Sequence, residues 1–87
     1  MNDIEARVRA FLAENFPTDP GAPPLLAETS LFEAGLIDSM GVLTVVTWIE
    51  ETFEVVVDDD EVVPENIDGV ARLTRYIAGK LAATGAA

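Results

Sequence analysis

Residues 31–40 read LFEAGLIDSM, and they join a long loop to a strongly apolar segment. Asp38 is a favourable helix-capping residue, and the apolar spacing from Met40 to Phe53 is typical of a helix. Ser39 therefore falls in the first helical turn, where backbone N–H groups have no intrahelical partner. The positive end of the helix dipole favours negative charge there, so a phosphate carried on Ser39 would be well placed.

Helix capping alone also explains the dipeptide Asp38-Ser39, because both residue types are favoured at helix starts. The spacing from Gly35, the chain length and the later segments favour a more specific interpretation. The stretch resembles the attachment site of acyl and peptidyl carrier proteins, in which a leucine, a short acidic stretch, a glycine and one or two apolar residues precede Asp-Ser-Leu. Met40 replaces that last leucine, a mild change, and the resemblance extends over residues 4–81.

The resemblance implies that Ser39 receives a 4′-phosphopantetheine arm, a covalent cofactor whose thiol holds an acyl or aminoacyl group as a thioester. Asp38 then serves as helix cap and recognition residue, with Met40 as its flank. The implied fold is all-α, a four-helix bundle with three longer helices, a short third helix and a long first loop. The implied partners are a phosphopantetheinyl transferase, with magnesium in its own site, and acyl or aminoacyl ligases or synthases. The chain itself would be a free-standing monomeric carrier, a cosubstrate and not an enzyme.

Length and composition limit the remaining possibilities. The 87 residues make one small domain, which we place at residues 1–82, with a frayed tail at residues 83–87. The absence of cysteine excludes a disulfide and a thiolate metal site. The absence of histidine removes the usual general base and the commonest metal ligand, so Ser39 is not expected to be a hydrolytic nucleophile.

The net charge of −11 argues against nucleic-acid binding. No basic residue lies between positions 10 and 71, whereas this stretch holds fourteen of the sixteen acids. We expect this field to attract basic surfaces of partner enzymes, although acidic residues also simply keep a small protein soluble. No segment is long enough to span a membrane and no signal-peptide core is evident, so the expected location is cytoplasmic.

Apolar residues at Ile4, Val8, Phe11 and Leu12 predict a first helix that Asn2 or Asp3 caps and that runs to about Asn15. Pro17 ends it, and a long loop follows. The loop residues expected to anchor to the core are Leu25, Leu26, Leu31, Phe32 and Leu36. A second helix is predicted from Ser39 to about Glu54. Its expected core face comprises Val42, Leu43, Val46, Ile49 and Phe53.

Residues 54–57 read EVVV and are interpreted as an extended linker, with Val55 and Val57 pointing inward. The acidic run at residues 58–61 lacks the spacing and central glycine of a calcium loop, so it is read as the start of a short third helix that Pro64 ends. Asp68 is the expected cap of the last helix. The buried positions expected on that helix are Val70, Leu73, Ile77 and Leu81.

A partner-binding face is predicted on the second helix, at Gly41, Thr44, Trp48 and Glu51. At the helical period Trp48 points away from the expected core face, and a large exposed aromatic is a common interaction hot spot. The alternative is that the long loop covers the indole with Leu25 or Leu26. Gly41 either leaves open space for a modifying enzyme or marks loose packing.

Carriers of fatty-acid synthesis usually have acids where this chain has Gly41 and Thr44. That difference favours an aminoacyl, peptidyl, polyketide-type or D-alanyl carrier, whereas the cargo itself cannot be identified from these residues. The alternative function is a non-acylated adaptor that uses the acidic face of the same bundle. The intact Asp38-Ser39 dipeptide argues against it.

Overall fold

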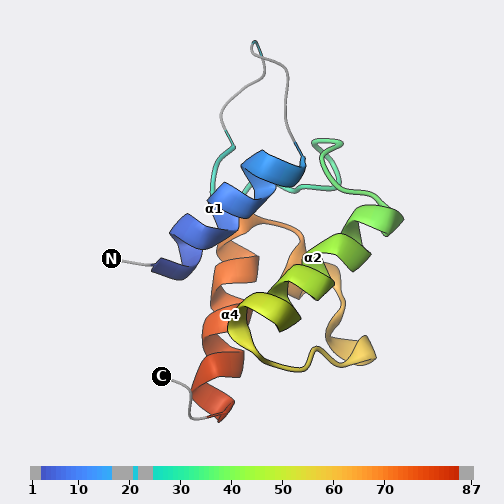
Figure 1. The fold of residues 1–87 in the computed structure, drawn as a ribbon. Coiled ribbons are helices and arrows are strands. Elements are labelled where there is room, and N and C mark those ends of the chain that lie inside the picture. The colour runs from blue at the N-terminus through green and yellow to red at the C-terminus, as the bar shows by residue number, and fades with distance from the viewer. Residues whose placement is uncertain (1–2, 17–20, 22–24, 85–87) are drawn as a thin grey trace.

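The computed structural model describes residues 3–16, 21 and 25–84. Its elements, in order, are α1 (Asp3–Asn15), α2 (Ser39–Phe53), the 3-10 helix η1 (Asp59–Glu61), α3 (Pro64–Ile67) and α4 (Val70–Thr84) (Figure 1). This part of the chain contains no strand. The predicted all-α fold, with three longer helices and a short third one, is confirmed. α4 extends two residues beyond the predicted domain end at residue 82.

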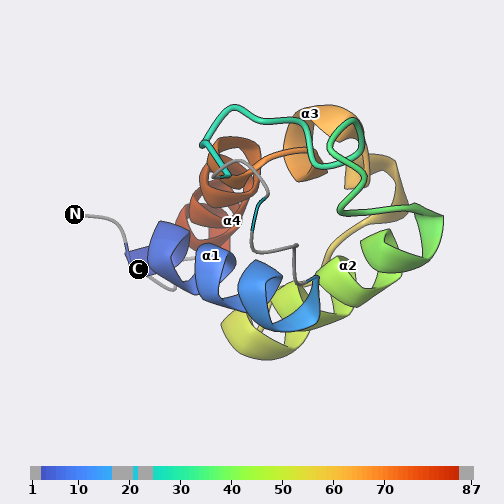
Figure 2. The same cartoon turned by 90° about the horizontal axis from the view of Figure 1, so that it is seen from above.

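The helix α4 packs against each of the other three α-helices. The loop from residue 25 passes over α4 to α3 before it turns to the start of α2 (Figure 2). The core draws on every helix except η1, and also on the loop and on the linker after α2. Its members are Val8, Phe11, Leu12, Leu31, Ile37, Val45, Ile49, Phe53, Val55, Val57, Ile67, Val70, Leu73 and Ile77.

The buried residues of α1 and α4 follow the predicted spacing. Val8, Phe11 and Leu12 are buried on α1, and the predicted residues Val70, Leu73 and Ile77 are fully buried on α4, while Leu81 is half-buried. The linker alternates as predicted: Val55 and Val57 are buried, and Val56 between them is 70% exposed. This alternation follows from extended backbone, in which successive side chains point to opposite sides.

The core face of α2 differs from the prediction. Leu43 is 64% exposed, whereas Val45, absent from the predicted face, is fully buried. The buried row repeats every four residues through Gly41, Val45, Ile49 and Phe53. Apolar residues occupy almost every side of α2, so periodicity did not determine which side faces the core.

The loop is anchored by fewer residues than predicted. Leu31 is fully buried and Leu25 and Leu36 are half-buried against the core, but Leu26 is 62% exposed and Phe32 is 39% exposed. The short turn that begins at Ser30 brings Leu31 inward, and residues 32–35 are exposed. The prediction for Leu26 and Phe32 is therefore wrong.

The third helix lies after the acidic run and begins at Pro64, where the prediction had it end. Proline suits the first helical position because its missing N–H would have no partner there. The acidic run forms the separate 3-10 turn η1, in which the Glu61 carboxylate accepts a hydrogen bond from the Asp58 N–H at 3.2 Å.

The start of α4 is capped by backbone and not by Asp68. The Ala71 N–H donates to the Ala27 carbonyl at 3.0 Å, across the loop. Gly69, just before α4, has a φ of +149°, and a Cβ on it would lie 3.3 Å from the Thr29 carbonyl oxygen. The Asp68 carboxylate is turned toward the loop, so the prediction that it caps α4 is wrong.

Gly35 ends a short turn in the left-handed conformation, with a φ of +76°. Its N–H donates to the Phe32 carbonyl at 3.1 Å, and the Leu36 N–H donates to the Leu31 carbonyl at 3.0 Å. These two bonds form a Schellman motif, in which a left-handed residue, usually glycine, closes the turn. The backbone conformation therefore explains why a glycine stands at position 35, where the chain turns toward Asp38.

We expect Gly35→Ala to destabilise the protein by about 1 kcal/mol, because a side chain is disfavoured in the left-handed region. A Cβ at this position meets no atom within 4 Å, so backbone strain accounts for the whole loss. Gly79→Ala is the matched control, since its added Cβ is equally unobstructed but sits inside α4. That change should stabilise by about 0.5–1 kcal/mol. Urea unfolding checks both, and equal signs for the two variants would contradict the explanation.

Candidate functional site

Ser39 is exposed in the first turn of α2. Asp38 is the N-cap, as predicted, and its side chain accepts a hydrogen bond from the Gly41 N–H at 2.9 Å. Its carbonyl accepts the first bond of the helix, from Val42 at 3.0 Å. Within the described chain, the N–H groups of Ser39 and Met40 have no hydrogen-bond partner. Two backbone donors thus remain available beside the Ser39 hydroxyl.

The chain has two serines, and their surroundings differ. The Ser30 hydroxyl donates to the Asp68 carboxylate at 2.5 Å and accepts from the Glu33 N–H at 3.1 Å. The Ser39 hydroxyl has no such partner among the described residues, and the residue is exposed. Ser39 is therefore the serine that can react with a group from outside.

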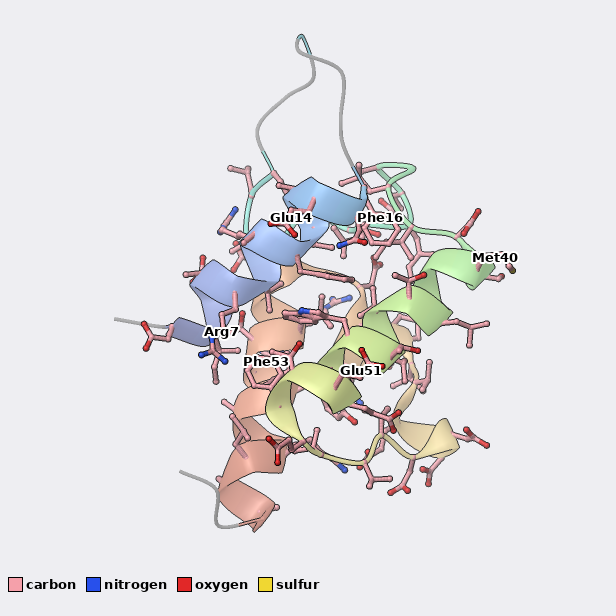
Figure 3. The ribbon with its side chains drawn as sticks, viewed as in Figure 1. Arg7, Glu14, Phe16, Met40, Glu51 and Phe53 are labelled. Carbon is pink, nitrogen blue, oxygen red and sulfur yellow. The ribbon has the colours of Figure 1, made fainter. Side chains whose placement is uncertain are left out.

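Two large apolar side chains are exposed near Ser39. Met40 is 73% exposed and extends from the outer end of α2 (Figure 3), and Leu43 one turn later is 64% exposed. A hollow of about 380 Å³ lies beside them, with Phe16, Leu36 and Thr44 among its lining residues.

Gly41 is buried in close packing. A Cβ on Gly41 would lie 3.1 Å from the Phe16 ring and 3.3 Å from the Ile37 side chain. Both expectations for this residue, open space for an enzyme and loose packing, are therefore wrong. The glycine allows the end of α1 to approach the first turn of α2, which helps to fix the direction of that turn.

Trp48 packs against the core, contrary to the prediction that it points away. Its ring stacks on Phe11 of α1, with the centroids 4.4 Å apart, and meets the edge of Phe53 at 5.4 Å. In these ring contacts the element that covers the indole is α1, whereas Leu26 is 62% exposed; cover by Leu25 stays a prediction. The sequence could not give this packing because it depends on how α1 crosses α2.

A groove of about 710 Å³ lies between α1 and α2. Thr44, Trp48 and Glu51 line it from α2, so the structure brings together three of the four residues predicted for the partner face. Arg7 and Glu14 line it from α1. Figure 3 shows Arg7 close to Phe53, and its guanidinium lies 5.6 Å from that ring centroid.

Two of the five basic residues, one on α1 and one on α4, form ion pairs within the described chain. Arg9 pairs with Glu5 at 3.0 Å and donates to the Leu25 carbonyl at 2.8 Å. Lys80 binds the Glu61 carboxylate at 2.9 Å, and Tyr76 donates to the same oxygen at 2.8 Å. Hydrogen bonds from Lys80 and Tyr76 lower the pKa of Glu61, and the contact with Glu61 adds to burial in raising the pKa of Tyr76.

Asp68 is a second acid with an altered pKa. Burial alone would raise it, but hydrogen bonds from the Ser30 hydroxyl and the Phe32 N–H, aided by the Leu31 N–H, outweigh burial and hold the pKa below its ordinary value of 3.8. Sequence reasoning missed this contact because Ser30 and Asp68 are 38 positions apart.

Stability should fall when the pH drops below about 4, because the unfolded chain then binds more protons than the folded one at Asp68 and Glu61. Protonating exposed acids relieves repulsion and acts in the opposite direction. The clean measurement is therefore the difference in urea unfolding between wild type and Asp68→Asn, from pH 7 to pH 3. We expect that difference to be largest at pH 7 and to shrink on acidification. A constant difference would contradict the lowered pKa.

Among the described helices, none is long and apolar enough to cross a membrane. No group of three or more potential metal ligands occurs in the same part of the chain.

A small helical bundle that presents one exposed serine at a helix start is consistent with a carrier for a covalently attached group. The sequence model of the phosphopantetheine attachment site matches residues 6–77, and the chain belongs to this family. It is also 35% identical to the acyl carrier protein of Beutenbergia cavernae over 81 residues, which cover 91% of this chain and 96% of that protein. No solved structure matches. The prediction of a non-catalytic carrier that uses phosphopantetheine is confirmed.

Proposed function

We propose that Ser39 is the attachment residue and that its arm carries an acyl or aminoacyl group as a thioester. The observation that supports this most is the exposed Ser39 hydroxyl beside the two free N–H groups of Ser39 and Met40. Those groups and the helix dipole favour a phosphate at this position. When bound, the arm supplies the thiol that the chain lacks, since the sequence has no cysteine.

The chain's own residues supply a nucleophile and its orientation. In the transfer, a bond forms between Ser39 Oγ and the phosphorus of coenzyme A that carries the pantetheine. The bond from that phosphorus to 3′,5′-ADP breaks, and the transferase takes the hydroxyl proton. Asp38 fixes the helix start through its bond to the Gly41 N–H. The Asp38 carboxylate is exposed, so a transferase can also recognise it.

Intact mass spectrometry after incubation with coenzyme A, magnesium and a promiscuous phosphopantetheinyl transferase tests this proposal. We expect one added phosphopantetheinyl group, and peptide mapping should place it on Ser39. An incubation without transferase is the control. A wild-type chain that stays unmodified, or a group found on another residue, would refute the assignment.

We also propose that the chain acts outside fatty-acid synthesis, as a free-standing cytoplasmic monomer. The exposed side of the first turns of α2 has Met40, Leu43, Thr44 and Thr47, and its first exposed acid is Glu51. An acyl carrier that partners recognised through acids in these turns would present an acidic surface at these positions. Size-exclusion chromatography with light scattering checks the monomeric state.

The groove between α1 and α2 is the partner surface that we propose, with Thr44, Trp48 and Glu51 on its wall. The acidic field of the chain should speed the approach of basic partners, and salt should therefore slow the transfer reaction. Glu51→Lys should slow transfer more than Glu65→Lys, which makes the same charge change on exposed α3. Equal rates for the two variants would leave the groove without a role in docking.

A further inference from the structure

The loop that leads to Ser39 is fastened to the junction between α3 and α4. The Asp68 carboxylate accepts hydrogen bonds from the Ser30 hydroxyl at 2.5 Å and from the Phe32 N–H at 2.9 Å. The Ala71 N–H binds the Ala27 carbonyl at 3.0 Å. Asp68 is 9% exposed, so its charge-assisted bonds are largely shielded from water.

The fastened residues belong to the turn that directs the chain into α2. Ser30 and Phe32 flank Leu31, whose side chain is fully buried and whose carbonyl accepts bonds from the Leu36 and Ile37 N–H groups at 3.0 and 3.4 Å. Ile37 is 4% exposed and directly precedes the cap of α2. Asp68 thus holds one end of a short rigid turn, and the other end presents Ser39.

We propose that Asp68 is a positioning residue for the modification of Ser39, acting through Ser30 and the turn of residues 30–37. The inference rests on the proposed function of Ser39. Asp68 does not contact the reacting hydroxyl. It keeps the segment before α2 in the one arrangement that a transferase can engage.

This role has a kinetic signature. We call the hydrogen bonds from Ser30 and Phe32 to the Asp68 carboxylate the Asp68 clamp. If Asp68→Asn weakens this clamp, part of the folded population has a displaced turn and is not a substrate. The apparent affinity then falls by the fraction that remains competent, whereas the rate at saturation is unchanged. We expect the KM of the transferase for this variant to rise about three- to tenfold, with kcat within error of wild type.

The control is Glu61→Gln in η1, which makes the same charge change at another hydrogen-bonded acid. Glu61 accepts its bonds from Tyr76 and Lys80 of α4. It should leave KM unchanged at a temperature where both variants are fully folded. Ser30→Ala provides a second route to the same clamp if Asp68→Asn folds poorly. It should raise KM similarly, and the double variant should be no worse than either single one.

Hydrogen exchange adds a readout independent of the transferase: Asp68→Asn should speed exchange at the amides of Leu36 and Ile37 and not at Val8 or Leu12 of α1. Wild-type KM for Asp68→Asn and Ser30→Ala, or a fall in kcat alone, would overturn the inference. Modification of Ser39→Ala would instead refute the proposed function, so the two failures are distinguishable.

Discussion

Ser39→Ala is expected to abolish attachment of the phosphopantetheinyl group completely. The variant lacks the only exposed serine hydroxyl, and Ser30 is held by Asp68 and Glu33. The fold should be unaffected, with a change in unfolding free energy within about 0.5 kcal/mol, because the side chain is exposed and the Asp38 cap remains. Intact mass after long incubation and urea unfolding measure the two effects.

Ser30→Ala is the matched control for this experiment. It removes the other serine, and after long incubation it should still be modified to completion, even if more slowly. An added mass on Ser39→Ala would show that another residue accepts the group. A large loss of stability in Ser39→Ala would mean that the first turn of α2 depends on the hydroxyl.

Leu31→Ala is expected to cost about 3 kcal/mol of stability, because removing a fully buried leucine side chain leaves a cavity. The free energy of unfolding of a small domain is low, so much of this variant should be unfolded at moderate temperature. Leu43→Ala is the matched substitution on the surface, at 64% exposure, and should change stability by less than about 0.5 kcal/mol.

Urea unfolding followed by circular dichroism compares the two leucine variants directly. The comparison is informative because both residues were predicted to lie against the core, Leu31 as an anchor of the loop and Leu43 by the helical periodicity of α2. Equal losses would mean that Leu43 faces the core as the sequence pattern predicted, and that the observed face, with Val45 buried and Leu43 exposed, is wrong.

Sequence periodicity was sufficient for α1 and α4, whose apolar residues form a single stripe with polar residues elsewhere. It was only partly correct for α2, where Ile49 and Phe53 are buried as predicted but Val45 is buried in place of Leu43. Apolar side chains surround that helix, so the positions of α1 and α4 decide which of them are buried. Trp48 shows this best, since its stacking on Phe11 joins two helices whose crossing no local pattern encodes.

The site was predictable as far as it is local. Asp38 and Ser39 are neighbours, and helix-capping chemistry places them correctly at the start of α2. The Asp68 clamp was not predictable, because it joins a serine and an acid far apart in the chain. An acid just before a helix is ordinarily read as its cap, and here Gly69 and the Ala27 carbonyl make that role unnecessary.

The bond between the Ala71 N–H and the Ala27 carbonyl bears on how the domain folds. The last helix obtains the partner for one of its first N–H groups only after the preceding segments have closed around it, and closing so long a loop has an entropic cost. A peptide of residues 64–84 alone should therefore be only weakly helical in water. The early and late parts of the chain should acquire structure together, so helix content and Trp48 fluorescence should follow one cooperative transition.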